Sequence, residues 1–191
     1  MIHFDDHIWD FDLQEALAAV SPQRREQALR YRHERDQRLC VAAYRLLHRA
    51  LLQEYGIDEA PRFDYNPQGK PLLMGHPDIH FSLSHCAMAV ACVLSDQPVG
   101  IDIETIDHYS EEVAARVMSE DEMREIKVSP RPATAFTRLW TMKESLYKLT
   151  GNDHDGNTAR MLDNITPYYF TTISHPKFLI TVCQHTLLEP V

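Results

Sequence analysis

Residues 99–104 read Val-Gly-Ile-Asp-Ile-Glu, an apolar β-strand pattern that carries two carboxylates. Alternate side chains of a strand share a face, so Asp102 and Glu104 point the same way, with their Cα atoms about 7 Å apart. Two carboxylates this close repel each other unless a cation or a basic group lies near them. The pattern fits a Mg²⁺ site completed by water and phosphate oxygens, and it also fits a strand with one face in water.

The composition around this strand is that of a globular protein. The 191 residues are 44% hydrophobic and 25% charged, which suits one ordinary domain or two small halves sharing a core. The first residues are acidic and lack the apolar stretch of a signal peptide, and no apolar run approaches the ~18 residues of a membrane span. The four cysteines show no metal-binding spacing, which indicates buried free thiols. We therefore expect a cytoplasmic protein with no membrane association.

The net charge of −9 argues against general nucleic-acid binding, yet the charge is unevenly distributed. Residues 24–49 hold eight arginines and three acids, a local balance of +5, so the rest of the chain carries about −14. A basic segment within an acidic protein suits a compact polyanionic ligand. On charge alone, a solvated helix face is an equally good interpretation.

Helical and strand patterns alternate along the chain. Residues 21–55 have helical character, with Ser21 as N-cap, Pro22 in the first turn and Gly56 as a stop signal, although the arginine-rich start could be a separate turn or short helix. Further along, the patterns predict a turn or loop at 66–71 within a proline-rich stretch, 61–77, followed by strands at 79–83, 87–94 and 99–104. Helices are expected at 111–126, with a possible helix start at 119–122 inside that span, and at 134–149, and strands at 168–173 and 178–183. Helix followed by strands thus occurs twice, which predicts two similar halves.

A second group of charged residues lies on the later helix, in the stretch Trp140-Thr-Met-Lys-Glu-Ser-Leu-Tyr-Lys148. Trp140, Glu144 and Lys148 fall at i, i+4 and i+8, along one side of the helix, with Lys143 beside them. A glutamate followed by a lysine at i, i+4 is also the commonest surface helix pair, so this motif alone decides little.

Three other patterns are weaker evidence for a functional site. Ser84 and His85 end the strand Phe-Ser-Leu-Ser-His, but adjacent strand residues point to opposite faces, which argues against a serine hydrolase. Histidines 76, 80 and 85 have no cysteine partner at zinc-ligand spacing. Asp153, Asp155 and Asn157 mimic the start of a calcium loop that then lacks its glycine and its closing glutamate.

Taken together, Gly-Ile-Asp-Ile-Glu at 100–104 and the Trp140–Lys148 motif about forty residues later, preceded by the strand 81–85 and by Gly69-Lys70-Pro71, resemble the surfactin-type 4'-phosphopantetheinyl transferases. The resemblance covers roughly residues 21–150. It implies an enzyme that transfers the 4'-phosphopantetheine arm of coenzyme A to a serine of an acyl or peptidyl carrier protein, with Mg²⁺, releasing 3',5'-ADP.

The same resemblance implies roles for single residues. Asp102, Glu104 and Glu144 are the implied Mg²⁺ ligands, and Glu144 is also the implied base for the carrier serine. Lys143 and Lys148 are expected near the pyrophosphate, with Lys148 also acting in catalysis. The expected coenzyme A contacts in the first half are Arg24, Arg38, Ser84 and His85 at the 3'-phosphate and Gly69, Lys70 and Pro71 beside the adenine.

The implied fold is α+β, with two similar α+β subdomains, 1–100 and 101–191, related by pseudo-twofold symmetry in one structural unit, and with coenzyme A between them. We expect a monomer. The chain departs from its relatives at Gln27, where they often have a lysine, and after Lys148, where they often have Gly-x-Gly-Leu. Two alternatives are a coenzyme A or adenine-nucleotide binding protein without turnover and a Mg²⁺-dependent phosphohydrolase. The sequence does not identify the carrier.

Overall fold

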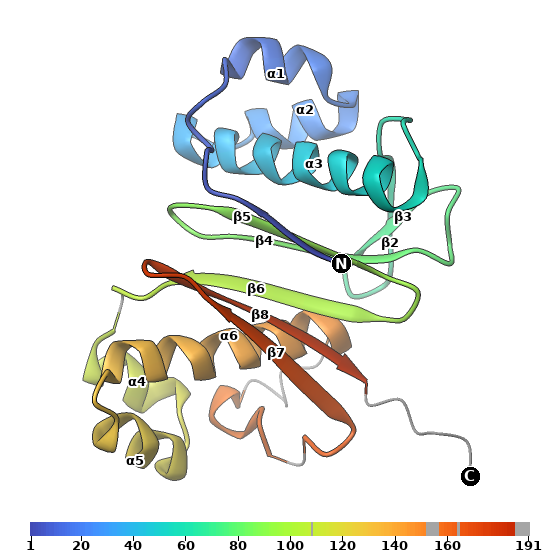
Figure 1. The fold of residues 1–191 in the computed structure, drawn as a ribbon. Helices are drawn as coiled ribbons and strands as arrows, with labels where there is room; N and C mark the ends of the chain where they lie inside the picture. Colours follow the sequence, from blue (N-terminus) through green and yellow to red (C-terminus); the bar gives the residue numbers. More distant parts are fainter. Residues whose placement is uncertain (108, 152–156, 164, 186–191) are drawn as a thin grey trace, which may run out of the picture. The chain divides into compact units, whose positions relative to one another are not determined.

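A computed structural model describes residues 1–107, 109–151, 157–163 and 165–185, and it divides the chain into two compact units, Met1–Gln97 and Pro98–Val191. Both units combine helices with small antiparallel sheets, so the expected α+β class is confirmed (Figure 1). The pseudo-twofold relation and the behaviour of the two halves as one structural unit stay predictions. Within the described residues, no helix is both long enough and apolar enough to span a membrane.

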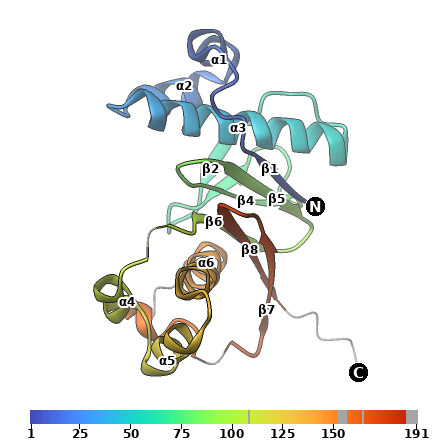
Figure 2. The same cartoon turned by 60° about the vertical axis from the view of Figure 1, so that its left-hand side comes forward.

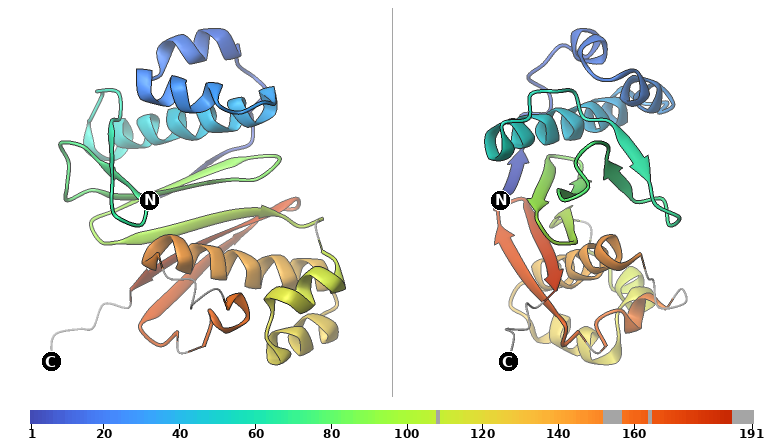
Figure 3. Two further views of the ribbon diagram at one scale, coloured as in Figure 1. Left: turned by 180° about the vertical axis from the view of Figure 1, so that it is seen from behind. Right: turned by 90° about the vertical axis from the view of Figure 1, so that its right-hand side faces the viewer.

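The first unit is a three-stranded antiparallel sheet covered by one long helix. Its sheet has the order β1-β5-β4, and α3 lies along one face of it (Figure 3). A separate hairpin joins β2 and β3. The elements are β1 (Ile2–Asp5), α1 (Leu13–Ala19), α2 (Pro22–Leu29), α3 (Glu34–Tyr55), β2 (Phe63–Tyr65), β3 (Pro71–Leu73), β4 (His80–His85) and β5 (Val90–Ser95).

The second unit is also a three-stranded antiparallel sheet with one long helix. The strand order is β6-β8-β7, α6 packs on β6 and β8, and α5 packs beside α6 (Figure 2). The elements are β6 (Val99–Thr105), α4 (Glu111–Val117), α5 (Glu120–Val128), α6 (Pro132–Thr150), the 3₁₀ turn η1 (Thr158–Arg160), β7 (Tyr168–Ser174) and β8 (Phe178–His185).

The structure departs from the sequence expectations in several elements. The span 21–55 is two helices rather than one, because its arginine-rich start forms the separate short helix α2, as one of the two interpretations allowed. The span 111–126 is also divided, because Ser119, at the possible start within it, caps a new helix with a capping box. The proline-rich stretch 61–77, where only the turn at 66–71 was expected, also contains the short strands β2 and β3. Neither β1 nor α1 was expected. The calcium-like residues 153 and 155 lie outside the described residues, as do residues 152–156 of the stretch 149–156 where the chain departs from its relatives.

Candidate active site

Gly100 determines how closely α6 approaches β6. A Cβ atom added at Gly100 would lie 2.0 Å from the carbonyl oxygen of Ser145 and 2.7 Å from the backbone nitrogen of Leu149. Both atoms belong to the backbone of α6, so no larger residue fits while the helix keeps its place. The face of β6 that holds Gly100 is therefore the one that α6 covers, and Asp102 and Glu104 follow on that face.

Asp102 forms an ion pair with Lys148 beneath α6. The Lys148 Nζ lies 2.7 Å from Asp102 Oδ1, and only 5% of Asp102 is exposed. Asp102 stands opposite Thr181 of β8, whose hydroxyl lies 2.7 Å from the hydroxyl of Thr141 in α6. The sequence also allowed a strand whose acidic face lies in water. That interpretation is wrong at Asp102, because its carboxylate is buried beside the Lys148 ammonium.

Glu144 is a second acid in the same electrostatic environment. Burial, and then the negative charge of Asp102, raise the pKa of the Glu144 carboxyl above its ordinary value, while the Lys148 ammonium acts in the opposite direction. Glu104 is half-buried, two residues beyond Asp102 on the same strand face. The structure thus gathers Asp102, Glu144 and Lys148 from the two motifs that the sequence analysis singled out, with Glu104 next along β6.

This set of donors fits a hard divalent cation. Carboxylate oxygens are the protein ligands that Mg²⁺ prefers, and carboxylates that lie close together repel one another unless a cation is near them. In the described ranges, however, these carboxylates do not bring one oxygen each within 4.8 Å of one another. One oxygen of Asp102 pairs with Lys148. Coordination of one ion by all three acids would require their carboxylates to lie closer together than they do here.

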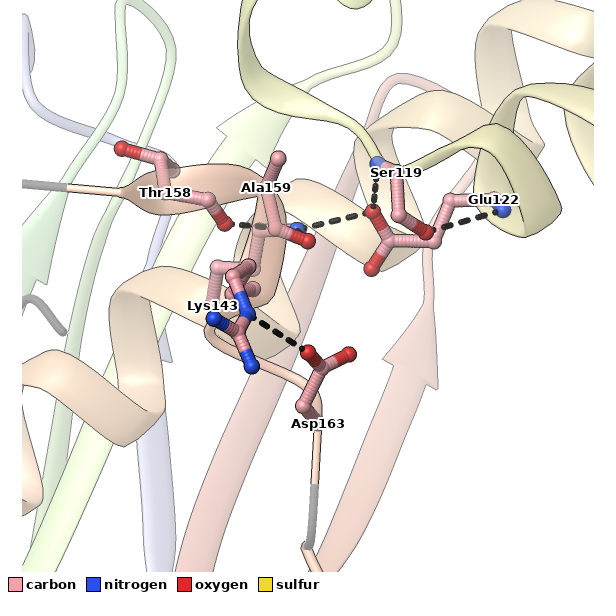
Figure 4. A network of polar contacts seen from close by, with 7 residues as sticks. Ser119, Glu122, Lys143, Thr158, Ala159 and Asp163 are labelled. Atoms are coloured by element: carbon pink, nitrogen blue, oxygen red, sulfur yellow. Dashed lines mark hydrogen bonds and ion pairs between the residues drawn. The ribbon is translucent and has the colours of Figure 1, made fainter.

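Lys143 lies apart from these acids. Its side chain is 0% exposed, and its Nζ lies 2.8 Å from Glu122 Oε2 of α5. It also donates to the carbonyl oxygens of Thr158 and Ala159 in η1 (Figure 4). Burial lowers the pKa of the Lys143 amine, and the ion pair with Glu122 opposes that shift. Lys143 was expected near a pyrophosphate together with Lys148, but the structure gives the two amines different protein partners.

In the first unit, the turn between β2 and β3 borders a cavity of about 360 Å³. The Asn66 side-chain oxygen accepts hydrogen bonds from the N–H groups of Gln68 and Lys70, and Gly69 adopts a φ of 82°, a left-handed conformation that favours glycine. Lys70 and Pro71 line the cavity, and burial lowers the pKa of the Lys70 amine. Further lining residues include Met74, His76, His80 and Phe81.

The guanidinium of Arg24 is packed between aromatic rings. Only 8% of Arg24 is exposed, and its Cζ lies 5.3 Å from the ring centre of Tyr44 and 5.2 Å from that of Phe63. Its Nε is buried, and none of the described residues provides it with an acceptor. A buried donor of this kind is costly unless a partner satisfies it, so an anion at Arg24 would be compatible with the local chemistry.

Arg38 is held by other protein groups. It forms an ion pair with Glu34 and donates to the carbonyl oxygen of Phe11 at 2.7 Å, and its guanidinium lies over the rings of Trp9 and Phe11. No contact that we observe in the described residues joins Arg38 to Arg24. The structure therefore places the two arginines expected at a 3'-phosphate in different aromatic surroundings.

Ser84 and His85 end β4, with Ser84 buried and His85 exposed. Phe63 connects this strand to Arg24, because its ring packs on that of Phe81 at 5.4 Å between centroids. Ser84 and His85 therefore lie on a strand whose start borders the cavity and whose Phe81 belongs to the same aromatic cluster as Arg24.

Several residues of the site were missed by sequence reasoning. Gly100 was read as part of a strand, and its role in admitting α6 has no signal in local periodicity. The pattern Ser119-x-x-Glu122 did signal a helix start, but nothing in the sequence paired Glu122 with Lys143. A cluster of Asp5, Asp6 and His7 was not anticipated either. We assign it no metal, because it is largely exposed and Asp5 pairs with Arg49.

The comparisons with known proteins agree on one family. The model of the 4'-phosphopantetheinyl transferase superfamily matches residues 98–185. The 4'-phosphopantetheinyl transferase Sfp of Bacillus subtilis is 29% identical over 200 residues, which cover 95% of this chain and 89% of the relative. The 4'-phosphopantetheinyl transferase psf-1 of Bacillus pumilus is 32% identical over 182 residues, 86% of this chain and 78% of the relative.

A more distant similarity points the same way. Enterobactin synthase component D of Salmonella typhimurium is 31% identical over 142 residues, which cover 71% of this chain and 58% of that protein. The matched family segment begins just before β6 and ends with β8, so it contains Gly100, both strand acids and the whole of α6.

Proposed function

The chain belongs to the 4'-phosphopantetheinyl transferase superfamily, and we propose how its residues serve that reaction. It is an enzyme that transfers phosphopantetheine to carrier proteins. The proposed donor is coenzyme A, the acceptor is a serine of an acyl or peptidyl carrier protein, and the second product is 3',5'-ADP. The observation that carries this assignment is the contact between the two motifs, in which Lys148 of α6 pairs with Asp102 of β6 beside Glu144.

In the proposed reaction, the serine oxygen attacks the β-phosphorus of coenzyme A. A bond forms between that oxygen and phosphorus, and the bond from phosphorus to the bridging oxygen breaks, so that the electron pair leaves with 3',5'-ADP. Glu144 accepts the serine proton, directly or through one water, which is the task of a general base. Lys148 offsets negative charge that develops on the phosphoryl oxygens.

Asp102, Glu104 and Glu144 are the residues that would hold Mg²⁺. When bound, Mg²⁺ would supply positive charge to the pyrophosphate oxygens and to the three acids. Charge compensation by Mg²⁺ and by Lys148 would let β6, whose other residues are Val, Gly, Ile and Thr, keep two acids on the face that α6 covers. Lys148 then has two tasks, because it pairs with Asp102 in this structure and would meet the phosphates during transfer.

We assign the nucleotide end of coenzyme A to the first unit. The cavity beside Lys70 and Pro71 suits the adenine, with Gly69 shaping the turn that borders it. Arg24 supplies a buried donor for the 3'-phosphate, and Ser84 and His85 are proposed as further contacts. Arg38 is proposed as a further 3'-phosphate contact, for which its guanidinium would have to exchange its present partners, Glu34 and the carbonyl oxygen of Phe11.

A single assay tests this function. The protein is incubated with coenzyme A, Mg²⁺ and each of a panel of apo carrier proteins, and the carrier is then weighed by mass spectrometry. We expect a mass gain of one phosphopantetheine arm on at least one carrier, and none with chelator present. Release of 3',5'-ADP without any carrier would instead indicate a phosphohydrolase. Coenzyme A binding without either product would indicate a binding protein.

A further inference from the structure

The Lys143 amine has no donor left for a ligand. An ammonium group carries three protons. The described residues provide three acceptors, Glu122 Oε2 at 2.8 Å, the Thr158 carbonyl oxygen at 2.8 Å and the Ala159 carbonyl oxygen at 3.4 Å. The side chain is also 0% exposed, so a phosphate would have to displace protein groups to reach it. These facts oppose a direct contact between Lys143 and the pyrophosphate.

The partners of Lys143 belong to two other segments of the second unit. Glu122 is the third residue of α5, and the same Oε2 atom accepts a hydrogen bond from the backbone N–H of Ser119 at 2.7 Å. Thr158 and Ala159 lie in η1. Through one ammonium group, α6 is thus tied both to the start of α5 and to η1 (Figure 4). Asp163 adds a further negative charge near this group.

The contacts of Lys143 with α5 and η1 also affect the direction in which α6 presents Glu144 and Lys148. Successive helix residues are separated by about 100° around the axis, so Lys143 and Glu144 point in different directions. Glu144 and Lys148 are only about 40° apart, and Lys148 contacts Asp102 of β6. Anchoring the Lys143 side of α6 therefore fixes the rotation of the helix that presents Glu144 and Lys148 toward the strand.

We propose that Lys143 is a positioning residue, which together with Glu122 orients α6 so that Glu144 and Lys148 meet the strand acids. This inference rests on the proposed function for its effect on rate, but its structural part concerns the second unit alone. Misplacement of a reacting group by about 1 Å can lower a rate by about 10². We therefore expect the tie to affect turnover and metal binding more than coenzyme A binding.

The test compares Lys143→Met, Glu122→Gln and the double variant with the parent. The matched control is Lys127→Met, which breaks the exposed ion pair of Lys127 with Glu111 in the neighbouring helix α4. For each protein, kcat, KM for coenzyme A, coenzyme A affinity by calorimetry and Mg²⁺ affinity are measured. Hydrogen–deuterium exchange of residues 157–163 reports directly on the tie to η1.

We expect Lys143→Met and Glu122→Gln each to lower kcat by about 10-fold or more and to weaken Mg²⁺ binding. The KM and the affinity for coenzyme A should stay within about twofold of the parent values. Exchange in 157–163 should rise in both, the double variant should be no worse than the poorer single one, and Lys127→Met should match the parent. If Lys143→Met fails to fold, Glu122→Gln alone decides, because it keeps the size of the side chain.

Two outcomes would overturn the inference, and a third would overturn the proposed function. Loss of coenzyme A affinity in Lys143→Met with a parent-like Glu122→Gln would make Lys143 a ligand contact. If Lys143→Met and Glu122→Gln lower the melting temperature but leave kcat and Mg²⁺ affinity unchanged, the contacts of Lys143 with Glu122 and η1 are purely structural. If the parent transfers nothing to any carrier, the proposed function fails instead, and Mg²⁺ affinity alone judges Lys143, with equal affinity in all variants counting against it.

Discussion

At the scale of single residues, Glu144 should show opposite effects on activity and stability. Its carboxyl pKa is raised, chiefly by burial and then by the charge of Asp102. A carboxyl whose pKa is higher in the folded state than in the unfolded state destabilises the fold as the pH rises through those values, and it has no such effect at a pH below both of them. Glu144→Gln keeps the shape and removes that penalty.

We therefore expect Glu144→Gln to lower turnover by about 10² or more, as for loss of a general base, and to leave the melting temperature at pH 7 equal to or slightly above that of the parent. At a pH below the ordinary glutamate value, the difference in stability should vanish. The measurements are steady-state rates at saturating coenzyme A and Mg²⁺, and melting curves over a pH series. Turnover within twofold of the parent would contradict the catalytic role.

Asp102 differs from Glu144 because it already has a cation. Asp102→Asn leaves the Lys148 ammonium, which is about a quarter exposed, without its carboxylate partner. We expect turnover to fall by about 10² or more and the protein to lose a modest amount of stability, about 1–3 kcal/mol, as when one partner of a partly buried charged hydrogen bond is removed. Glu112→Gln, which breaks an exposed pair with Arg116, is the control. Full activity of Asp102→Asn at low millimolar Mg²⁺ would remove Asp102 from the site.

At the scale of elements, the contact between β6 and α6 makes Gly100→Ala informative. The added methyl group would meet backbone atoms of Ser145 and Leu149, which cannot rotate away as a side chain can. We expect a loss of about 1–3 kcal/mol of unfolding free energy, the usual cost of overpacking, together with a large loss of turnover, because α6 must move off Asp102. Chemical denaturation and the transfer assay measure both.

Gly56→Ala is the matched control for this element. Gly56 adopts a left-handed φ of 69° at the end of α3, and nothing lies within 4 Å of an added Cβ. That variant should lose stability through backbone strain alone and keep its turnover. If Gly100→Ala were as active as Gly56→Ala, close approach of α6 to β6 would not matter for the site.

At this scale, the sequence predicts features that depend on the regular spacing of residues within one strand or one helix. Strand alternation correctly placed Asp102 and Glu104 on one face of β6, and helical spacing placed Glu144 near Lys148 on α6. Residues whose roles depend on distant partners were not predictable in this way. The pairing of Lys143 with Glu122 and the contact of Gly100 with Ser145 are set by how α5 and β6 pack on α6, which no local period encodes.

The missed elements have a similar cause. Asn66 to Pro71 was read as a loop from its turn-forming residues, and that turn does exist, but the three-residue strands on either side are too short to show a period. β1 is a four-residue edge strand that pairs with β5, far away in the chain. Arg24 is buried because its guanidinium packs against the rings of Tyr44 and Phe63. The charge pattern of the basic segment does not reveal this tertiary contact.

At the scale of the whole molecule, the four cysteines provide probes for both units. All four are free and buried, with three in the first unit and Cys183 in the second. Burial raises the pKa of Cys183 to about 12, and it raises that of Cys92 further still. The thiolate is the reactive form, so we expect none of the four to react with a thiol reagent at pH 8 in the native protein, and all four to react in denaturant.

The same thiols test whether the chain is one structural unit. Each unit is a three-stranded sheet with one long helix, in fewer than 100 residues, and so small a domain buries only about 60% of its surface and is marginal by itself. We therefore expect the two units to unfold together, with Cys92 and Cys183 becoming reactive at the same urea concentration, as read by mass spectrometry after pulsed labelling. A variant with Cys183→Ala checks that the signals are assigned correctly. Labelling of Cys183 at clearly lower urea than Cys92, or the reverse, would show units that fold separately and would contradict the expectation of a single cooperative molecule.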